Sequence, residues 1–487
     1  MPAPVSVKKR RVYFFNTLCD PASCFRMNTK PTRLFSGASP EEVQQDLLPL
    51  VDFQDAGQSL TNINRLVEEK LLPHLMRYDH AGFQSMYNSI PEQGAALGAR
   101  IALVHNQGVT NWQVSPGGAM LEELCCQSLC RLFRLSEQAD ATFMYSGTYA
   151  NQEALYLAIH RKAELEGFDF GMEGMSGFED PSRLVILTSS DAHFSINQSA
   201  RMLGLGEQNL ISLEVGSNRQ IDPEQLTQTL AELKGVKDVC CVVATAGTTS
   251  TGAIDPIEAL LEAAQQCNAW LHLDGAYGFS FSLLPEYQAL FKGIEKVDSI
   301  TWDPHKQLGI PIPNSVLFVN DKQDFARINL FSHYFNRETS SEPNPGIKSP
   351  PSTRPMSALP LVTSLLHQGM DEILEKLRAP FRNIQRLAEH LVAQEDFHCW
   401  HEPDTGILCF QHQPAHVPEN HRNDLQTFIY ETILAQGKRS ISVTQLDEAV
   451  VLRILVMSSG ICYEDLLETI TDIRSIGAGF DLDDQAR

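Results

Sequence analysis

Short β-prone runs separated by helical segments dominate the middle of this 487-residue chain. The β-prone runs are Thr142–Tyr145, Leu184–Thr188, Val239–Thr245, Trp270–Leu273, Ser299–Trp302 and Ser315–Val319. Val239–Thr245 is apolar almost throughout, which is typical of a strand buried on both faces of a parallel sheet. Strands that alternate with helices form a mostly parallel sheet covered by helices on both faces. The sequence therefore predicts an α/β domain whose ligands bind at the carboxyl ends of the strands.

The pattern along the chain predicts three parts. Residues 1–110 form an N-terminal segment that we expect to be largely helical, apart from an irregular region between Tyr87 and Asn111. Residues 111–374 form the large domain that contains the sheet. Residues 375–487 form a small C-terminal α/β domain with strands at Gly406–Phe410, Ser440–Thr444 and Ala449–Leu455.

Two helices of the large domain have clear sequence signals. Apolar residues recur on one stripe from Ser115-Pro116 onward, which is the spacing of an amphipathic helix that packs on a large surface. Asp255-Pro256 is expected to supply the N-cap and the first-turn proline of a second helix.

Composition and charge restrict the class of function. The formal net charge of −22 argues against a protein whose main task is to bind nucleic acid. The 11 cysteines lack the C-x-x-C spacing of zinc sites, which predicts no metal and the reduced thiols of an intracellular, cytoplasmic protein. We recognise no signal peptide and no apolar run that could cross a membrane. The basic run Lys8-Lys9-Arg10-Arg11 could contact nucleic acid or lipid, but a solvated terminus explains it better.

Polar groups follow several of the predicted strands. Ser146-Gly147-Thr148 precedes a helix, whose N-terminus favours a phosphate, although a plain N-cap would explain the same residues. Asp274 could hold a heteroaromatic nitrogen protonated, or it could be a cap or turn aspartate. His193 offers a flat ring for stacking on a cofactor, or it could be an ordinary core or surface histidine. Thr245 ends a further strand.

The stretch Ser299–Lys306 places a lysine just beyond a β-prone run. A lysine acts as a nucleophile only after it loses its proton, which a partly buried site beside another cationic group promotes, and it can then form a Schiff base with a carbonyl. Lys306, next to His305, meets this need. An ordinary surface lysine after a strand is the alternative.

Taken together, these residues in this order are what pyridoxal phosphate requires. The chain resembles the group II pyridoxal-phosphate-dependent amino-acid decarboxylases, the family of the glutamate, aromatic amino acid, cysteine sulfinate and diaminobutyrate decarboxylases. The stretches that carry the resemblance are Ser146–Asn151, Asp191-Ala192-His193, Ala244–Thr249, His272–Gly278 and Asp303-Pro304-His305-Lys306.

The resemblance implies a fold and a role for each site residue. The fold is the aspartate aminotransferase-like fold type I of pyridoxal-phosphate enzymes. Lys306 is implied to hold the cofactor, pyridoxal 5'-phosphate, as a Schiff base, while Asp274 faces its pyridinium nitrogen and His193 stacks over its ring. Further contacts to the phosphate and the ring substituents are implied for Gly147, Thr148, His305, Thr245 and Ala276. Asp303 stands where several members have asparagine near the phosphate.

The family forms homodimers with active sites shared between subunits. The N-terminal segment is therefore expected to pack on the partner, and Thr353, just before Arg354, to approach the partner's cofactor phosphate. Tyr334 lies in a long polar segment where a family tyrosine protonates Cα after carbon dioxide has left. A surface aromatic residue in a linker is the alternative for Tyr334.

The implied activity is decarboxylation of an L-amino acid to the corresponding amine and carbon dioxide. We expect an acidic or diamino acid as substrate, of the aspartate, glutamate or 2,4-diaminobutyrate kind. An aromatic amino-acid decarboxylase and an oxidative aldehyde synthase are the enzymatic alternatives. A binding or regulatory protein on a decayed enzyme scaffold is a third, which the intact Lys306, Asp274 and His193 argue against.

Overall fold

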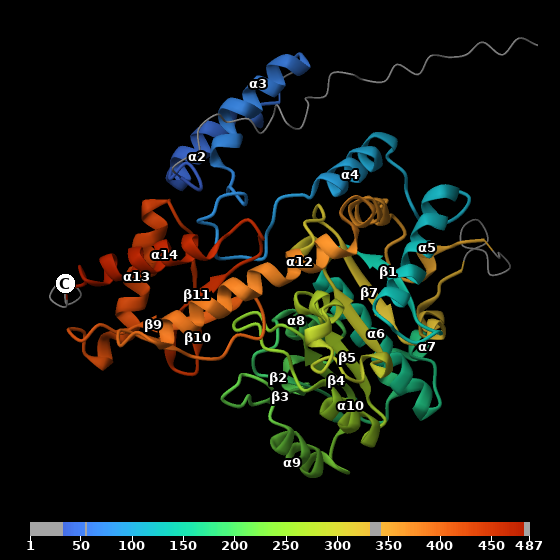
Figure 1. Ribbon diagram of the computed structural model, residues 1–487. Coiled ribbons are helices and arrows are strands. Elements are labelled where there is room, and N and C mark those ends of the chain that lie inside the picture. Colours follow the sequence, from blue (N-terminus) through green and yellow to red (C-terminus); the bar gives the residue numbers. More distant parts are fainter. Residues whose placement is uncertain (1–32, 54–55, 332–341, 482–487) are drawn as a thin grey trace, which may run out of the picture.

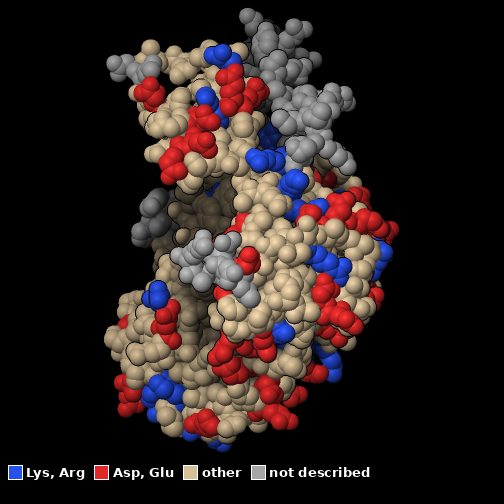
Figure 2. Space-filling model, turned by 90° about the vertical axis from the view of Figure 1, so that its left-hand side faces the viewer, with Lys and Arg blue, Asp and Glu red and all other residues tan. Residues whose placement is uncertain are grey.

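The structure is a computed structural model that describes residues 33–53, 56–331 and 342–481. Figure 1 shows a large sheet enclosed by helices, a smaller unit built from the C-terminal part of the chain, and an arm of two helices that projects from the body. The arm consists of α2 (Pro40–Leu47) and α3 (Leu60–Lys70). In Figure 2 the arm stands above the body, and a hollow lies between them.

The large sheet has seven strands in the order β1-β7-β6-β5-β4-β2-β3. Its strands are β1 (Asp140–Met144), β2 (Leu184–Ser189), β3 (Leu210–Leu213), β4 (Asp238–Thr245), β5 (Trp270–Asp274), β6 (Ser299–Trp302) and β7 (Ser315–Val319). Only β7 runs against its neighbours among these strands, so the predicted mostly parallel sheet is confirmed. The edge strand β3 was not predicted because it is short and half-exposed and therefore lacks the apolar run of a buried strand.

Helices cover both faces of this sheet (Figure 1). On one face lie α6 (Gly147–Glu166) and α8 (Ser195–Met202), packed on a core that includes Trp270. On the other lie α5 (Pro116–Leu132) and α10 (Ile257–Gln266). The remaining large-domain helices are α7 (Phe170–Glu173), α9 (Pro223–Leu233) and α11 (Pro304–Gln307).

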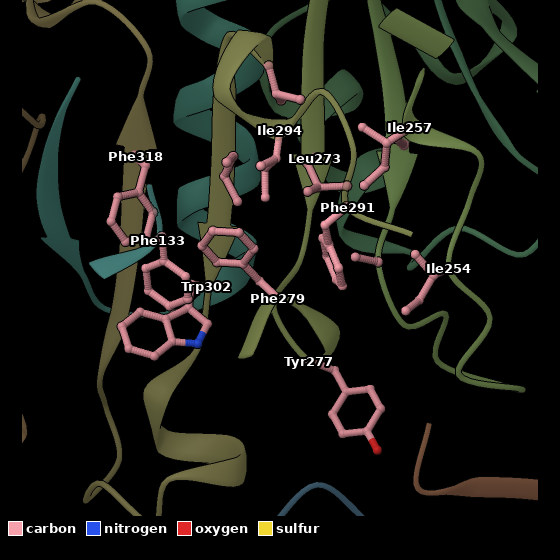
Figure 3. Packing of buried hydrophobic residues seen from close by; sticks show 14 of the residues in the cluster. Phe133, Ile254, Ile257, Leu273, Tyr277, Phe279, Phe291, Ile294, Trp302 and Phe318 are labelled. Atoms are coloured by element: carbon pink, nitrogen blue, oxygen red, sulfur yellow. The ribbon is translucent and has the colours of Figure 1, made fainter. Parts of the chain in front are cut away.

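An aromatic cluster under the sheet anchors the strand that precedes Lys306 (Figure 3). Phe133 stacks on Phe279 with ring centroids 4.2 Å apart, and it meets the edge of Trp302, the last residue of β6, at 5.0 Å. The Trp302 indole donates to Ser280 Oγ at 2.8 Å. Buried aromatic pairs of this kind add to the free energy gained from burial alone, so the end of β6 is held firmly.

The C-terminal unit contains a four-stranded antiparallel sheet in the order β10-β11-β9-β8. Its elements are β8 (Phe397–Cys399), β9 (Ile407–His412), α13 (Arg422–Gln436), β10 (Ser442–Leu446), β11 (Ala449–Leu455) and α14 (Tyr463–Gly477). The helix α12 (Ala358–Val392) reaches this unit from the large sheet and is interrupted at Gly369, whose φ of 71° is not helical. Among the described residues, no helix has the length and apolar character needed to cross a membrane.

The expectation of irregular structure between Tyr87 and Asn111 is wrong, because this region contains the helix α4 (Gln93–His105). The Glu92 carboxylate caps the helix by accepting the Ala95 N–H at 3.0 Å. Small residues on one side let α4 lie close to α12: a Cβ on Gly98 would come within 2.3 Å of Thr363 Oγ1. Alanines and glycines gave no apolar stripe in the sequence, so tertiary packing rather than amphipathic pattern defines this helix.

The expectation that Asp255 caps a helix is also wrong. The helix α10 begins at Ile257, and its N-cap is Pro256. The buried Asp255 carboxylate accepts the backbone N–H of Thr245 at 2.8 Å and that of Ile221 at 2.9 Å. Burial raises the pKa of Asp255 to about 7. Its role is to tie the end of β4 to a neighbouring loop.

Gly98→Ala tests the close packing of α4 on α12. The new methyl group would meet Thr363 Oγ1 and the Leu359 carbonyl, so we expect the variant to lose roughly 1–3 kcal/mol of stability. Chemical denaturation followed by circular dichroism measures the loss. Gly117→Ala in α5 is the matched control, because nothing lies within 4 Å of its new methyl group. Equal stability of the two variants would contradict the packing.

Candidate active site

Eight of the ten residues singled out from the sequence line one pocket at the carboxyl ends of the strands. The pocket has a volume of about 260 Å³, near the lower end of the range for small-molecule sites. The eight residues are Gly147, Thr148, His193, Thr245, Asp274, Ala276, His305 and Lys306. They come from five different connections that follow strands, as the topology of a parallel sheet requires.

Lys306 sits in the short helix α11 directly after β6. Its Nζ lies 3.2 Å from Asp303 Oδ2 and 5.1 Å from the centre of the Tyr87 ring. The neighbouring His305 donates from Nδ1 to the Asn314 carbonyl at 2.5 Å, which leaves its Nε2 on the side of Asp303, 3.8 Å from Oδ2. The lysine is thus partly enclosed, with an acidic partner on one side and an aromatic face on another.

The N-terminus of α6 forms a second wall of the pocket. Ser146 is the N-cap, and its hydroxyl accepts the Tyr149 N–H at 3.3 Å, so the capping interpretation of this turn holds alongside its place in the pocket. The first backbone N–H groups of a long helix lack partners within the helix and favour an anion. A Cβ on Gly147 would come within 2.8 Å of Asp303 Oδ2, which shows how closely the Asp303 carboxylate approaches this helix end.

Two further side chains line the pocket, one from the connection after β2 and one from the end of β4. His193 accepts the Ser195 N–H at Nδ1, 3.2 Å away, so its other nitrogen carries the proton when the ring is neutral. Burial lowers the pKa of His193, opposed by the nearby Asp274, and this favours the neutral ring. Thr245 has a buried hydroxyl without a hydrogen-bond partner among the described residues. In a pocket wall, such a hydroxyl is free to form a hydrogen bond with a bound molecule.

Asp274, the last residue of β5, is buried and held on both carboxylate oxygens. Oδ1 accepts the Ala276 N–H at 3.2 Å, and Oδ2 accepts an N–H of the Asn151 side chain at 2.8 Å. The contact with Ala276 is that of a turn aspartate, whereas the contact with Asn151 comes from the helix α6. The carboxylate is therefore fixed in position at the pocket wall.

The other two predicted residues do not line the pocket. Tyr334 lies outside the described residues, and its role stays a prediction. Thr353 is exposed, and its carbonyl accepts a hydrogen bond from the Tyr145 hydroxyl. The next residue, Arg354, is buried in an ion pair with Glu122, so the segment is anchored to α5.

Three residues near the pocket were not singled out from the sequence. Asn151 lies one helical turn after Gly147, and this spacing was a usable signal for it. Tyr87 donates its hydroxyl to the Thr249 carbonyl at 2.8 Å, and the Arg453 guanidinium lies 5.4 Å from the centre of the Tyr87 ring. Tyr87 and Arg453 come from the N-terminal segment and the C-terminal unit, and no local pattern links them to the strand ends.

Comparison with known proteins identifies the family. A family model described as the pyridoxal-dependent decarboxylase conserved domain matches residues 40–413. The chain belongs to this family. It is a pyridoxal-phosphate-dependent amino-acid decarboxylase, and pyridoxal phosphate is its cofactor.

Similar proteins are found among curated decarboxylases. The chain is 25% identical to an L-2,4-diaminobutyrate decarboxylase of Acinetobacter baumannii, with 91% of this chain and 88% of that one covered. A protein of the same name from Rhizobium meliloti is 29% identical, with 79% and 76% covered. The acidic amino acid decarboxylase GADL1 of mouse is 27% identical, with 78% and 68% covered.

Solved structures agree on the fold. The glutamate decarboxylase domain of a Vibrio parahaemolyticus protein titled diaminobutyrate-pyruvate transaminase and L-2,4-diaminobutyrate decarboxylase superposes with a TM-score of 0.82 at 22% identity, covering 92% of this chain and 91% of that one. Mouse CSAD superposes with a TM-score of 0.83 at 24% identity, covering 91% and 93%. The α/β fold predicted from the sequence, that of fold type I, is therefore confirmed.

The pocket suits the cofactor. A helix N-terminus is available for the phosphate, the fixed Asp274 carboxylate for the pyridine nitrogen, and Lys306 for the aldehyde. The unpartnered Thr245 hydroxyl supplies a further polar contact. Asp303 alone is an unusual neighbour for a phosphate, since its carboxylate is 4% exposed and its Oδ1 has no partner among the described residues.

Asp303→Asn should tighten the binding of pyridoxal phosphate. If Lys306 binds the cofactor as predicted, binding breaks its ion pair with Asp303 and brings a phosphate toward a buried negative charge. Removing that charge should lower the dissociation constant of the cofactor roughly tenfold at pH 8, which corresponds to a gain of about 1.4 kcal/mol in binding free energy. Titration of the apoenzyme with pyridoxal phosphate, followed by absorbance, measures this.

Asp324→Asn is the matched control, because this buried aspartate pairs with Arg327 outside the pocket. Its cofactor affinity should equal that of the wild type. Weaker cofactor binding by Asp303→Asn would show that the carboxylate helps to hold the cofactor.

Proposed function

We propose that the enzyme decarboxylates a short L-amino acid with a second amino group, of the 2,4-diaminobutyrate kind. The charge of the pocket carries this proposal. Among the described lining residues, Asp274 and Asp303 are acidic, and Lys306 is the one lysine or arginine. Since the cofactor occupies Lys306 and adds a phosphate, the filled pocket is negative and favours a cationic side chain.

The relatives support the same substrate class. The two diaminobutyrate decarboxylases are 25% and 29% identical to this chain, and the first covers nearly its full length. An acidic amino acid is the second candidate, since GADL1 is 27% identical. One structural feature favours it: Arg453 is buried beside Tyr87, and its Nε and Nη2 have no acceptor among the described residues. A substrate carboxylate would satisfy such a group.

Some residues of the pocket would bind the cofactor, and Asp274 would control the proton on its ring nitrogen. Bound pyridoxal phosphate supplies the electron sink for the bond that breaks at Cα. Lys306 would bind the aldehyde of the cofactor. Asp274 would hold a proton at the pyridine nitrogen, and His193 would lie against the ring. The N-terminus of α6 would bind the phosphate and so fix the position of the cofactor in the pocket.

Purified enzyme with added pyridoxal phosphate should show its highest kcat/KM with L-2,4-diaminobutyrate in a panel that includes glutamate, aspartate, cysteine sulfinate and the aromatic amino acids. Chromatography of the amine product and a carbon dioxide assay give the rates, and Lys306→Ala is the inactive control. A preference for glutamate or aspartate would favour the second candidate. Release of ammonia and peroxide would instead reveal an aldehyde synthase.

We also propose that two copies form a dimer through the N-terminal arm. The helices α2 and α3 have no buried residue within one chain. Apolar side chains such as Leu60 and Phe53 are 80% and 90% exposed. Exposed apolar faces of this kind mark interaction sites. A second copy of the chain is the occupant that the family resemblance implies.

Leu60→Asp tests the dimer. Leu60 is the first residue of α3, where a carboxylate suits the helix dipole, so the substitution should not harm the helix itself. We expect the wild type to be a dimer by light scattering and Leu60→Asp to be a monomer at micromolar concentration. Met172→Asp, at an equally exposed apolar position in α7, should remain a dimer. A monomeric wild type would contradict the proposal.

We further infer a cytoplasmic location. The described residues contain nine cysteines, all of them free and most of them buried. Unpaired thiols in a protein of this size are typical of a reducing compartment.

A further inference from the structure

A row of buried polar groups leads from Asp274 into the protein through Asn151, which also lines the pocket. Trp270 Nε1 lies 2.7 Å from Ser299 Oγ, which lies 2.9 Å from His272 Nδ1. His272 Nε2 lies 3.0 Å from Asn151 Oδ1, and Asn151 Nδ2 lies 2.8 Å from Asp274 Oδ2. None of the five side chains is more than 5% exposed.

The chemistry of the two ends, together with a neutral His272 ring, determines the direction of every hydrogen bond in this row. An indole N–H can only donate, and a carboxylate can only accept. Asp274 therefore accepts from the Asn151 amide N–H, and Asn151 Oδ1 accepts from His272 Nε2. Because burial lowers the pKa of His272 and keeps the ring neutral, His272 Nδ1 carries no proton and accepts from Ser299, whose oxygen accepts from Trp270. Hydrogen bonds that point the same way along a row polarise and strengthen one another.

His272 determines the orientation of the Asn151 side-chain amide. Burial lowers the pKa of His272 to about 4, partly offset by Asp274, so the ring is neutral at ordinary pH. With Nδ1 accepting from Ser299, the only proton of the ring is on Nε2. An inverted Asn151 amide would face this proton with its NH₂ group and would present its oxygen to the Asp274 carboxylate. Both contacts would be repulsive, so His272 prevents the inversion.

The second N–H of the Asn151 amide is also used, because Asn151 Nδ2 lies 2.9 Å from Ser195 Oγ. Ser195 begins α8, two residues after His193. The amide is thus held at its oxygen by β5 and at its nitrogen by β5 and α8. A side chain fixed at three points can position Asp274 without help from the cofactor.

We propose that Asn151, oriented by His272, is a positioning residue that holds the Asp274 carboxylate in line with the pyridine nitrogen of the cofactor. Ser299 acts one step further back by fixing the proton of His272 on Nε2. The inference rests on the proposed role of Asp274 and adds the residues that make that role possible.

The experiment uses holoenzyme loaded with pyridoxal phosphate that carries ¹⁵N in the ring, because the ¹⁵N resonance reports directly whether this nitrogen holds a proton. In the wild type the resonance should be that of a pyridinium. His272→Phe should move it toward the value of an unprotonated pyridine and lower kcat about 10- to 100-fold, the usual effect of removing an outer-shell partner, with KM little changed. His272→Gln keeps an N–H donor and should restore much of both.

Ser299→Ala and Ser280→Ala form a matched pair that remains informative if His272→Phe does not fold. Each serine accepts a hydrogen bond from a buried tryptophan, at 2.7 Å and 2.8 Å, but only Ser299 also contacts His272. Ser299→Ala should shift the resonance in the same direction as His272→Phe, and Ser280→Ala should leave it unchanged.

Two results would overturn the inference and are distinguishable. If Asp274→Ala shifts the resonance while the His272 and Ser299 variants do not, Asp274 acts without this row. If Asp274→Ala also leaves the resonance unchanged, the proposed role of Asp274 itself fails.

Discussion

The parallel register of β4, β5 and β6 is the constraint on which the site depends. Thr245 pairs with Asp274, and Asp274 pairs with Thr301, so these residues form one row across the sheet near its carboxyl edge. Because strand side chains alternate between faces, a slip of one residue would turn Asp274 to the opposite side. The same register pairs His272 with Ser299. The pocket and the polar row behind it are consequently products of one alignment.

Much of this arrangement was predictable because it is local in sequence. Buried strands can be recognised in the sequence as apolar runs. A parallel sheet brings the residues that follow these runs to one edge, so His193, Asp274 and Lys306 could be predicted to lie together. What was missed depends on tertiary contact. The helix α4 exists because small residues fit against α12, and Arg453 reaches Tyr87 only after the C-terminal unit has packed on the large domain. Neither relation leaves a periodic signal in the sequence.

Asp303 places a negative charge between Lys306 and the N-terminus of α6. In the structure the Asp303 carboxylate pairs with Lys306, whose Nζ lies 3.2 Å from Asp303 Oδ2. If Lys306 binds the cofactor as proposed, binding must first separate this pair. The Asp303 carboxylate also faces the helix end that is proposed to bind the phosphate. The pairing therefore gives the partly exposed Lys306 an acidic neighbour, which under this proposal lowers the affinity for the cofactor.

The helix α6 joins the two ends of the cofactor site. Its first turn offers an anion site at Gly147, and its second turn carries Asn151, which contacts Asp274. If the phosphate and the pyridine nitrogen bind as proposed, one helix contacts the cofactor's phosphate and also the carboxylate that faces its pyridine nitrogen. A helix rises 1.5 Å per residue and bends little over one turn, so the spacing of these two contacts cannot drift as the rest of the chain moves.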